Sequence, residues 1–384
     1  MPLLDLGWAI FCKWFIDRRL YFTVLLRDFI LKARMALTAN PRGVSSSEEA
    51  SWVTGVSSPE GTAPLYSQEE AAALVSRLCE ALLGVSPYTH IVHPEQEIPE
   101  ASLPALQAAL ARLTAGEPLQ YVLGYADSLG MRLRVTPAVL IPRPETEELC
   151  RRVIAFYASD APATASSSGL SAQVSAFSSA PASGSAPRAI LDLCCGSGCI
   201  TWAMARAFPD ALVVGVDLSA EALDVARSQN VMPSDVPSPA SPSAPGLSEI
   251  PAPIFLQADV LKVPDLLRTL ESVLVQNGCD GFDLLLSNPP YVREQERVLM
   301  SRNVLDFEPS MALFVPDGDA LRFYRAIREV WLSPLLRPQA RLALEINEAL
   351  GPETLSLFPI GESGRSPRLE KDFNEKNRYI FSEK

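Results

Sequence analysis

The sequence is poor in histidine and in positive charge, and it lacks any long apolar run. Its 384 residues include only two His, and 33 Lys and Arg stand against 45 Asp and Glu, a formal charge of -12. A protein that binds nucleic acid through phosphate contacts normally carries a net positive charge, so broad duplex-DNA binding is disfavoured. No apolar run approaches the roughly 20 residues that span a bilayer, and no secretory signal is present. We therefore expect no stable nucleic-acid binding and no membrane span.

Cysteine is present in an odd number and without the spacing of a metal site. Three of the seven Cys crowd at Cys194, Cys195 and Cys199, and no second pair accompanies them. A structural zinc site needs four suitably spaced ligands, so no metal is expected and the cysteines are interpreted as buried, reduced thiols. Reduced thiols and the missing signal favour a cytoplasmic protein. The mitochondrial matrix is the alternative if residues 1–37 are a presequence. We expect a monomer.

The first 37 residues mix aromatic and basic side chains, and several interpretations of them stay open. An amphipathic helix on a membrane surface or an organelle presequence would fit that mixture, but Asp5, Asp17 and Asp28 weaken both. An extra packing helix is favoured. The third alternative is a true start at Met35, with the upstream segment a gene-model extension.

Proline is in marked excess, and its distribution divides the chain. Many of the 33 Pro lie in three tracts dominated by Ser, Ala, Pro and Gly, at residues 40–64, 159–187 and 233–253. Such tracts have little apolar area to offset the entropy of ordering, so they are interpreted as flexible insertions. Without them the working protein has about 300 residues, enough for two domains.

The remaining chain alternates between strand and helix patterns after a helical segment at residues 66–116. Short apolar runs predict strands at 189–193, 212–216, 254–258, 282–287 and 340–346. Helical patterns between them lie at 199–208, 220–230, 264–276 and 320–332. This alternation requires right-handed crossovers and a mostly parallel sheet covered on both faces, so the fold class is α/β. Ligands bind such sheets at the carboxyl ends of the strands.

A glycine turn follows the first of these strands, in Asp192-Leu-Cys-Cys-Gly196-Ser-Gly198. Gly196 and Gly198 permit positive φ and close approach of the backbone to a ligand, although such a turn also occurs without any ligand. Thr201 stands where the dinucleotide fingerprint has its third glycine, which argues against NAD or FAD.

Carboxylates end the next two strands. Asp217, 19 residues beyond Gly198, can accept both hydroxyls of a ribose, and Asp259 is placed to meet an adenine edge. Both could instead be simple helix caps. Together with the glycine turn they outline an adenosine pocket without a polyphosphate cradle, which suits S-adenosylmethionine.

The fourth strand leads into Ser287-Asn-Pro-Pro-Tyr291. Pro289 and Pro290 have fixed φ and no N–H, so their carbonyls are presented as rigid acceptors. Asn288 adds a side-chain acceptor and Tyr291 a flat apolar face. This arrangement suits a planar NH2 group, whose delocalised lone pair makes it a poor nucleophile unless acceptors take its hydrogens and aim it at a methyl donor.

These motifs resemble those of a known family. Besides Asn288 to Tyr291, the segments that carry it are 116–124, 139–149 with Arg143-Pro-Glu145, 307–313, and Lys371-Asp372 with Arg378. The chain resembles the protein-(glutamine-N5) methyltransferases that act on peptide-chain release factors, from about Tyr66 to the C-terminus apart from the two internal insertions.

The resemblance implies a class I methyltransferase sheet of seven strands, the last antiparallel, joined to a small helical domain by a β-hairpin linker. The implied layout is an N-terminal extension at 1–64, partly disordered, a helical substrate-docking domain at 65–118, a linker at 119–145 and a methyltransferase domain at 146–384. The implied cofactor-binding residues are Cys194, Cys195, Gly196, Ser197, Gly198, Asp217, Asp259, Val260 and Asn288. The implied catalytic and glutamine-binding residues are Asn288, Pro289, Pro290 and Tyr291. Arg143 and Glu145 are either substrate ligands or a buried ion pair that braces the linker.

Two positions depart from the family's usual residues. The family often has glycine where this chain has Cys194, and tryptophan where it has Val260, so adenine stacking is the least secure of the expected contacts.

The leading hypothesis is methyl transfer from S-adenosylmethionine to the amide nitrogen of the glutamine in the Gly-Gly-Gln loop of a release factor. The same tetrapeptide can grip the amino group of a flipped base, so an N6-adenine type methyltransferase is the alternative. The acidic balance counts against it. A non-catalytic interaction protein on the same scaffold is the third interpretation, and the intact Asp217 and Asn288 count against that one.

Overall fold

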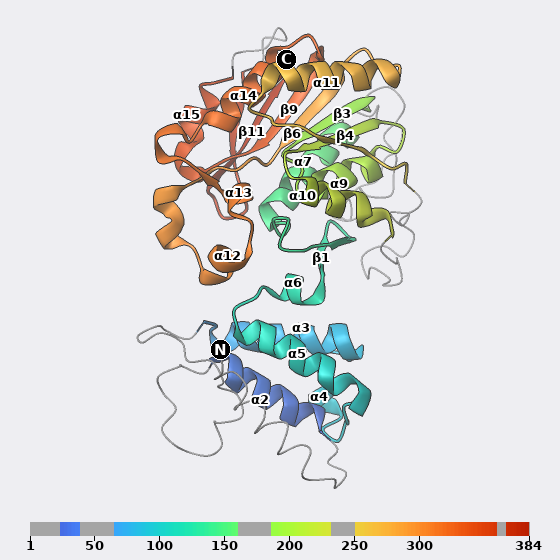
Figure 1. Cartoon of the computed structure of the whole chain (residues 1–384), viewed down its shortest axis with the longest axis vertical. Helices are drawn as coiled ribbons and strands as arrows, with labels where there is room; N and C mark the ends of the chain where they lie inside the picture. The colour runs from blue at the N-terminus through green and yellow to red at the C-terminus, as the bar shows by residue number, and fades with distance from the viewer. Residues whose placement is uncertain (1–23, 39–64, 160–185, 232–249, 359–365, 384) are drawn as a thin grey trace. The chain divides into compact units, whose positions relative to one another are not determined.

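The computed structural model describes residues 24–38, 65–159, 186–231, 250–358 and 366–383. Nearly all of the three low-complexity tracts and most of the first 37 residues lie outside these ranges. The chain divides into two compact units (Figure 1). One comprises residues 1–123 with 302–306, and the other comprises 124–301 with 307–384.

The first unit is built from helices around one apolar core. Its elements are α2 (Leu26–Thr38), α3 (Gln68–Leu83), α4 (Thr89–Val92), the 3-10 turn η1 (Glu100–Ser102), α5 (Leu103–Thr114), α6 (Leu119–Leu123) and most of α12 (Arg302–Phe307). Helix α3 begins at a capping box in which the Ser67 hydroxyl accepts the Glu70 N–H and the Glu70 carboxylate accepts the Ser67 N–H. It ends at Gly84, whose φ of 66° suits a residue without Cβ. Leu26, Leu78 and Leu106 from three different helices are buried together.

Helix α2 belongs to this unit, so the helical unit begins well before residue 65, where the sequence-based layout began it. Leu26, Phe29 and Ile30 are buried against α3 and α5. The favoured sequence interpretation of an extra packing helix describes residues 26–38 correctly. A start at Met35 would remove these three side chains from the core.

A second segment joins the helical unit from far along the chain. Residues 302–306 follow the Asn-Pro-Pro-Tyr motif, and the amide of Asn303 donates to the Tyr66 hydroxyl at 2.9 Å and to the Gly116 carbonyl at 3.0 Å. Nothing in the local sequence pattern predicts this pairing, because its partners are separated by well over a hundred residues.

The second unit is a seven-stranded sheet with helices on both faces, which confirms the expected fold class. The sheet strands are β3 (Ala189–Leu193), β4 (Leu212–Asp217), β5 (Ile254–Gln257), β6 (Phe282–Ser287), β9 (Leu336–Glu345), β10 (Arg368–Lys371) and β11 (Asn377–Glu383). Their order is β10-β11-β9-β6-β3-β4-β5. Five are parallel, whereas β11 pairs antiparallel with both β9 and β10. The last strand is therefore antiparallel, as the resemblance implied.

Smaller elements complete this unit. The hairpin strands are β1 (Tyr125–Ser128) and β2 (Met131–Arg134), and a short pair is β7 (Val292–Arg293) with β8 (Phe314–Val315). The helices are α7 (Pro144–Ser159), α9 (Cys199–Ala207), α10 (Ala220–Arg227), α11 (Val263–Gln276), α13 (Ser310–Leu313), α14 (Arg322–Leu332) and α15 (Gly351–Leu355). The 3-10 turns are η2 (Ser228–Val231), η4 (Glu294–Leu299), η5 (Asp317–Asp319) and η6 (Glu348–Leu350).

Successive residues of β3 face opposite sides of the sheet, and each side has its own core. Leu191 and Leu193 pack with α11 and α14, whereas Ile190 packs with α7 and α9. Both faces are apolar because both are covered, which explains why these strands appear in the sequence as continuous apolar runs.

The chain reverses its direction across the sheet between β3 and β6, and this reversal positions the site. Strands β4 and β5 follow on one side of β3, and β6 returns to its other side. The ends of the two central strands are tied together, since Leu193 pairs with Ser287 and the Ser287 hydroxyl donates to the Leu193 carbonyl at 2.6 Å. Such a reversal opens a crevice at the carboxyl ends of the strands.

Candidate active site

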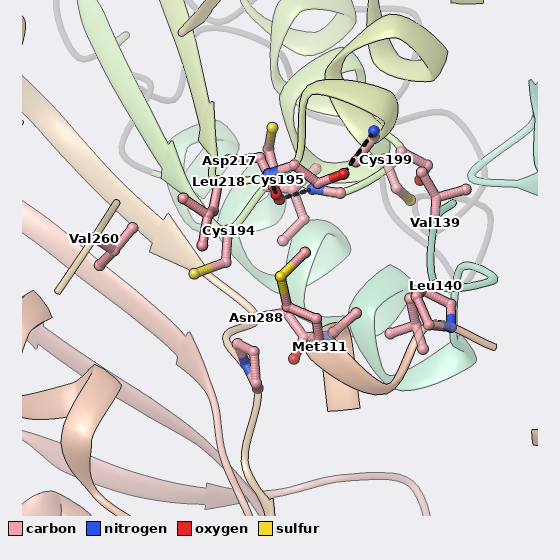
Figure 2. Close-up of a pocket in the computed structure, with 18 of the residues that line it drawn as sticks. Val139, Leu140, Cys194, Cys195, Cys199, Asp217, Leu218, Val260, Asn288 and Met311 are labelled. Carbon is pink, nitrogen blue, oxygen red and sulfur yellow. Dashed lines mark hydrogen bonds between the residues drawn. The ribbon is translucent and has the colours of Figure 1, made fainter. Parts of the chain in front are cut away.

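A cavity of about 340 Å³ lies at this edge of the sheet. Its lining comes from the loops after β3, β4, β5 and β6, from linker residues 138–143, and from Met311 and Phe323 among others. In Figure 2 Cys194, Cys195 and Asp217 lie on one side of the cavity, and Asn288 with Met311 lies on the facing side. We call the first side the cofactor wall and the second the reacting wall.

The cofactor wall begins with a tightly wound loop between β3 and α9. Cys194, Gly196 and Gly198 all have positive φ, of 61°, 53° and 78°. At Gly196 an added Cβ would meet nothing within 4 Å, so the backbone is open to the cavity there. At Gly198 a Cβ would lie 3.0 Å from Trp202 and 3.1 Å from Ala226, so that glycine is needed for packing as well as for its φ. The glycines predicted from the sequence thus serve two different purposes.

Three N–H groups of this loop form hydrogen bonds within the protein. Cys195 donates to the Val216 carbonyl at 2.9 Å, Gly196 to a carboxylate oxygen of Asp217 at 2.8 Å, and Gly198 to the Cys195 carbonyl at 2.8 Å. A pyrophosphate site needs such groups free and directed at the ligand. These three N–H groups are therefore not available to a polyphosphate chain, which is compatible with the cofactor expected from the sequence.

Asp217 stands at the end of β4, on the edge of the cavity. One carboxylate oxygen accepts the Gly196 N–H and the other accepts the Ser219 N–H at 2.9 Å. Burial raises the pKa of Asp217, and the two N–H bonds oppose that rise. Each carboxylate oxygen has room for a second donor, so this side chain can still accept the two hydroxyls of a ribose.

Asp259 and Val260 line the cavity beyond the end of β5, where the sequence placed them. The Asp259 carboxylate accepts the Leu261 N–H at 2.9 Å, and Val260 is buried. The carboxylate thus makes a turn bond to the residue two positions on, and because the N-cap of α11 is Lys262, Asp259 does not cap that helix. Its contact with adenine stays a prediction.

The reacting wall holds Asn288 and its neighbours. The Asn288 amide donates to the Thr146 hydroxyl at 3.0 Å, and the Tyr291 hydroxyl donates to a carboxylate oxygen of Glu345 at 2.9 Å. Asn288 and Pro290 line the large cavity. Asn288, Pro289 and Tyr291 line a second cavity of about 50 Å³ beside it. Asn288 is therefore shared by a large and a small cavity.

Arg143 and Glu145 do not pair with each other. Arg143 lines both cavities and forms an ion pair with Glu308 at 2.6 Å. The Glu308 carboxylate is buried and also accepts the Ile141 N–H at 3.2 Å. The expected ion pair that braces the linker exists, but its acidic partner is Glu308. Within the described residues Glu145 lines neither cavity, and its backbone carbonyl accepts the Tyr379 hydroxyl at 2.9 Å.

Sequence reasoning missed Thr146 and Glu345. Thr146 lies inside the Arg-Pro-Glu segment that carried the resemblance, one residue after Glu145. Glu345 ends strand β9 and could have been found by the rule that flagged Asp217, because it too is a carboxylate at the carboxyl end of a parallel strand. Because Glu345 stands before the apolar Ile346, within the strand predicted at 340–346, the sequence pattern does not mark it as a strand end.

The cysteines near the site are free thiols. Burial raises the pKa of Cys194, Cys195 and Cys199, so all three are protonated at neutral pH. Within the described part of the chain there is no group of three or more His, Cys, Asp or Glu that could hold a metal ion. None of the helices that the structure describes is long and apolar enough to cross a membrane.

The seven-stranded sheet and this cavity define a class I S-adenosylmethionine-dependent methyltransferase. Two family models match the chain, the PrmC N-terminal domain over residues 60–124 and a methyltransferase domain over residues 190–236. A release factor glutamine methyltransferase from Bacteroides thetaiotaomicron is 33% identical and matches 82% of this chain and 94% of its own length. The chain belongs to the release factor glutamine methyltransferase family.

Further relatives have the same description. The release factor glutamine methyltransferase of Streptococcus pneumoniae is 30% identical over 82% of this chain and 93% of its own length. That of Flavobacterium psychrophilum is 29% identical over 84% and 94%. The matches cover both units, so the resemblance inferred from the motifs is confirmed.

Proposed function

We propose that the protein transfers the methyl group of S-adenosylmethionine to the side-chain amide nitrogen of the glutamine in the Gly-Gly-Gln loop of a release factor. The observation that supports this most is the pair of adjoining cavities. Asn288, Arg143, Leu140 and Ala312 line both, so a group in the small cavity would face one in the large cavity across Asn288.

The two cavities differ in size as the two reactants do. The large one has space and hydrogen-bond acceptors for a nucleoside with an amino-acid tail, and the loop that borders it has no free polyphosphate cradle. The small one, bounded by Pro289, Tyr291 and Leu313, is the narrower of the two and suits a planar amide better than a larger base. This favours a glutamine side chain over an adenine.

The protein's part in the reaction is to orient a weak nucleophile. When bound, S-adenosylmethionine supplies an electrophilic methyl group on a sulfonium. Asn288 and the carbonyls presented by Pro289 and Pro290 accept the two hydrogens of the glutamine NH2, so the nitrogen lone pair is directed toward the large cavity. The cofactor held by the cofactor wall would supply its methyl group to this nitrogen, a carbon–nitrogen bond replacing the carbon–sulfur bond, and the nitrogen would then lose a proton to water. No metal or covalent protein intermediate is required.

The site assignments form part of the same proposal. Cys194 to Gly198, Asp217, Asp259 and Val260 would hold the cofactor, and Asn288 to Tyr291 would hold the glutamine. Arg143 would bound the glutamine cavity while it braces the linker. The helical unit would dock the release factor, and the cytoplasm would be the site of action.

The test is to incubate the purified protein with labelled S-adenosylmethionine and, in separate reactions, release factor, DNA and RNA. We expect label in the release factor only. A release factor with glutamate in place of the loop glutamine is the matched control and should remain unlabelled. Label in nucleic acid but not in release factor would replace this proposal with the amino-base alternative.

A further inference from the structure

Glu345 is a buried carboxylate at the end of β9, and it holds two residues of the reacting wall. Only 1% of the residue is exposed. One oxygen accepts the Thr146 hydroxyl at 2.7 Å, and the other accepts the Tyr291 hydroxyl at 2.9 Å. Burial raises the pKa of Glu345, whereas the two hydroxyls and the nearby charge of Arg378 lower it and Glu145 adds to the rise. Arg378 is itself held by an ion pair with Asp372 at 3.0 Å.

These bonds determine the direction of the next one. A threonine hydroxyl has a single proton, and that of Thr146 is donated to Glu345. The Thr146 oxygen can then only accept from the group on its other side. That group is the Asn288 amide nitrogen, 3.0 Å away.

The consequence concerns the amide of Asn288. Its nitrogen and oxygen ends have nearly the same shape, so packing alone does not decide which of them faces the cavities. The acceptor at Thr146 takes the nitrogen end, and the oxygen end is left for the ligand. The chain of bonds from Asn288 through Thr146 to Glu345 therefore turns Asn288 into an acceptor on its cavity side.

We propose that Thr146, anchored by Glu345, is a positioning residue that fixes the amide direction of Asn288 and thereby makes the site select an NH2 group over a carboxylate oxygen. This inference rests on the proposed function, since it explains how glutamine is preferred to glutamate. Through Tyr291 the same carboxylate also holds the ring that bounds the small cavity.

The test compares Thr146→Val, which keeps the shape and removes the hydroxyl, with Thr146→Ser, which keeps the hydroxyl. The matched control is Thr354→Val. Thr354 is also buried, lies in α15 outside both cavities, and donates its hydroxyl to the Leu350 carbonyl. With release factor as substrate we expect Thr146→Val to lower kcat about 10- to 100-fold, which is the range for a lost buried hydrogen bond. Thr146→Ser should stay within about threefold of wild type, and Thr354→Val likewise.

Two further readouts separate positioning from general destabilisation. The dissociation constant for S-adenosylmethionine should change less than about threefold in Thr146→Val, since the cofactor wall is intact. In an Asn288→Ala background, Thr146→Val should lower kcat less than about twofold further, because its effect passes through the missing amide.

A measurement without turnover completes the test. In protein labelled with 15N at asparagine, the side-chain amide signal of Asn288 is the one lost in Asn288→Ala. One of its two hydrogens should exchange slowly in wild type and Thr146→Ser, and quickly in Thr146→Val. If the exchange is unchanged in Thr146→Val, or kcat stays within threefold of wild type, the positioning role is wrong. If wild type fails to methylate release factor while the exchange result holds, the failure lies in the proposed function instead.

Discussion

The two walls of the large cavity differ in the atoms that form them, since one is mainly backbone and the other is mainly side chains. The cofactor wall is made mainly of backbone, with three positive-φ residues wound into a loop whose N–H groups bond to the loop itself, to Val216 and to Asp217. The reacting wall is made of side chains: Asn288 and Thr146 line the large cavity and bond to each other, and Glu345 behind them accepts from both Thr146 and Tyr291.

This difference has consequences for substitution. A wall of backbone is set by φ and ψ, so its shape depends little on the side chain at Cys194. A side-chain network requires that each donor meet an acceptor, so the loss of one member leaves others unpaired. We therefore expect that a side-chain substitution at the reacting wall lowers the reaction rate strongly. A side-chain substitution at the cofactor wall should weaken cofactor binding by a smaller factor.

The largest effect is expected for Asn288→Ala. The loss of the acceptor that orients the amide should lower kcat by about 10²- to 10³-fold, as the loss of one oriented polar group in an active site does. The dissociation constant for S-adenosylmethionine should rise only a few-fold. Steady-state kinetics with release factor and equilibrium cofactor binding measure the two quantities. Asn277→Ala, which removes an amide bonded to the Val273 carbonyl at the end of α11, is the control and should behave as wild type. Full activity in Asn288→Ala would mean that the acceptor has been misassigned.

Asp217→Asn tests the other wall. The amide would place a donor against either the Gly196 N–H or the Ser219 N–H, and the charged acceptor for the ribose would be lost. The dissociation constant for S-adenosylmethionine should therefore rise about 10- to 100-fold, with kcat at saturating cofactor within a few-fold of wild type. Asp224→Asn, on the exposed side of α10, should change neither. A fall in kcat without loss of affinity would show that the two walls do not divide binding and chemistry in this way.

A smaller effect concerns Asp192, the carboxylate beneath the glycine loop. It is fully buried, and while one oxygen accepts the Thr201 hydroxyl at 2.6 Å, the other has no hydrogen-bond partner among the described residues. Burial raises its pKa to about 7, and the charge of Asp217 adds to the rise. The folded state therefore binds this proton more tightly than the unfolded state, and this contribution to stability is lost as the pH rises toward and through 7.

Urea unfolding at pH 6 and pH 8 measures this contribution. Relative to Asp192→Asn, which cannot titrate, the free energy of unfolding of the wild type without cofactor should fall by about 1 kcal/mol between the two values. Other titrating groups, including Glu345, are common to both proteins and cancel in the difference. An equal pH dependence in both proteins would show that Asp192 is ionised throughout this range.

The smallest effect is expected for Cys194→Gly. Its φ of 61° already suits glycine, and the loop bonds that shape the wall come from the backbone. The dissociation constant for S-adenosylmethionine should change less than about threefold. A change above tenfold would mean that the thiol itself forms part of the cofactor contact, and the contrast between the walls would then fail.

The comparison also separates what the sequence could predict from what it could not. The strands 189–193 and 282–287 were predicted with the bounds that the structure has, because buried parallel strands appear as continuous apolar runs between polar ends. The glycine loop follows the end of β3 directly, and Asp217 ends β4. The residues of the cofactor wall can therefore be located from the predicted strand ends.

The reacting wall could be predicted only in part. Asn288 to Tyr291 is contiguous and was found, but its partner Thr146 is 142 residues away and Tyr291 reaches Glu345 across 54. Side-chain bonds across such separations leave no local pattern. The same holds for Glu308, whose pairing with Arg143 spans 165 residues.

Element boundaries failed where polar residues interrupt a strand or helix. Strand β9 begins at Leu336, whereas the sequence predicted a start at Ala340. Arg337, Pro338 and Gln339 interrupt the apolar pattern at the beginning of the strand. Residues 337–339 are partly or fully exposed, and the pairing of β9 with β6 changes register there. Helix α10 ends at Arg227 and continues as a 3-10 turn, where a helix to Asn230 was predicted.

The most direct test of the central claim is to locate the transferred methyl group. Release factor methylated by the purified protein is digested, and the peptide that contains the Gly-Gly-Gln loop is fragmented by mass spectrometry. We predict one added methyl group on the side-chain nitrogen of that glutamine, with about 10²- to 10³-fold slower methylation at the same position in reactions containing Asn288→Ala in place of wild type. A methyl group on any other residue, or an unmodified loop peptide alongside methylated nucleic acid, would contradict the account.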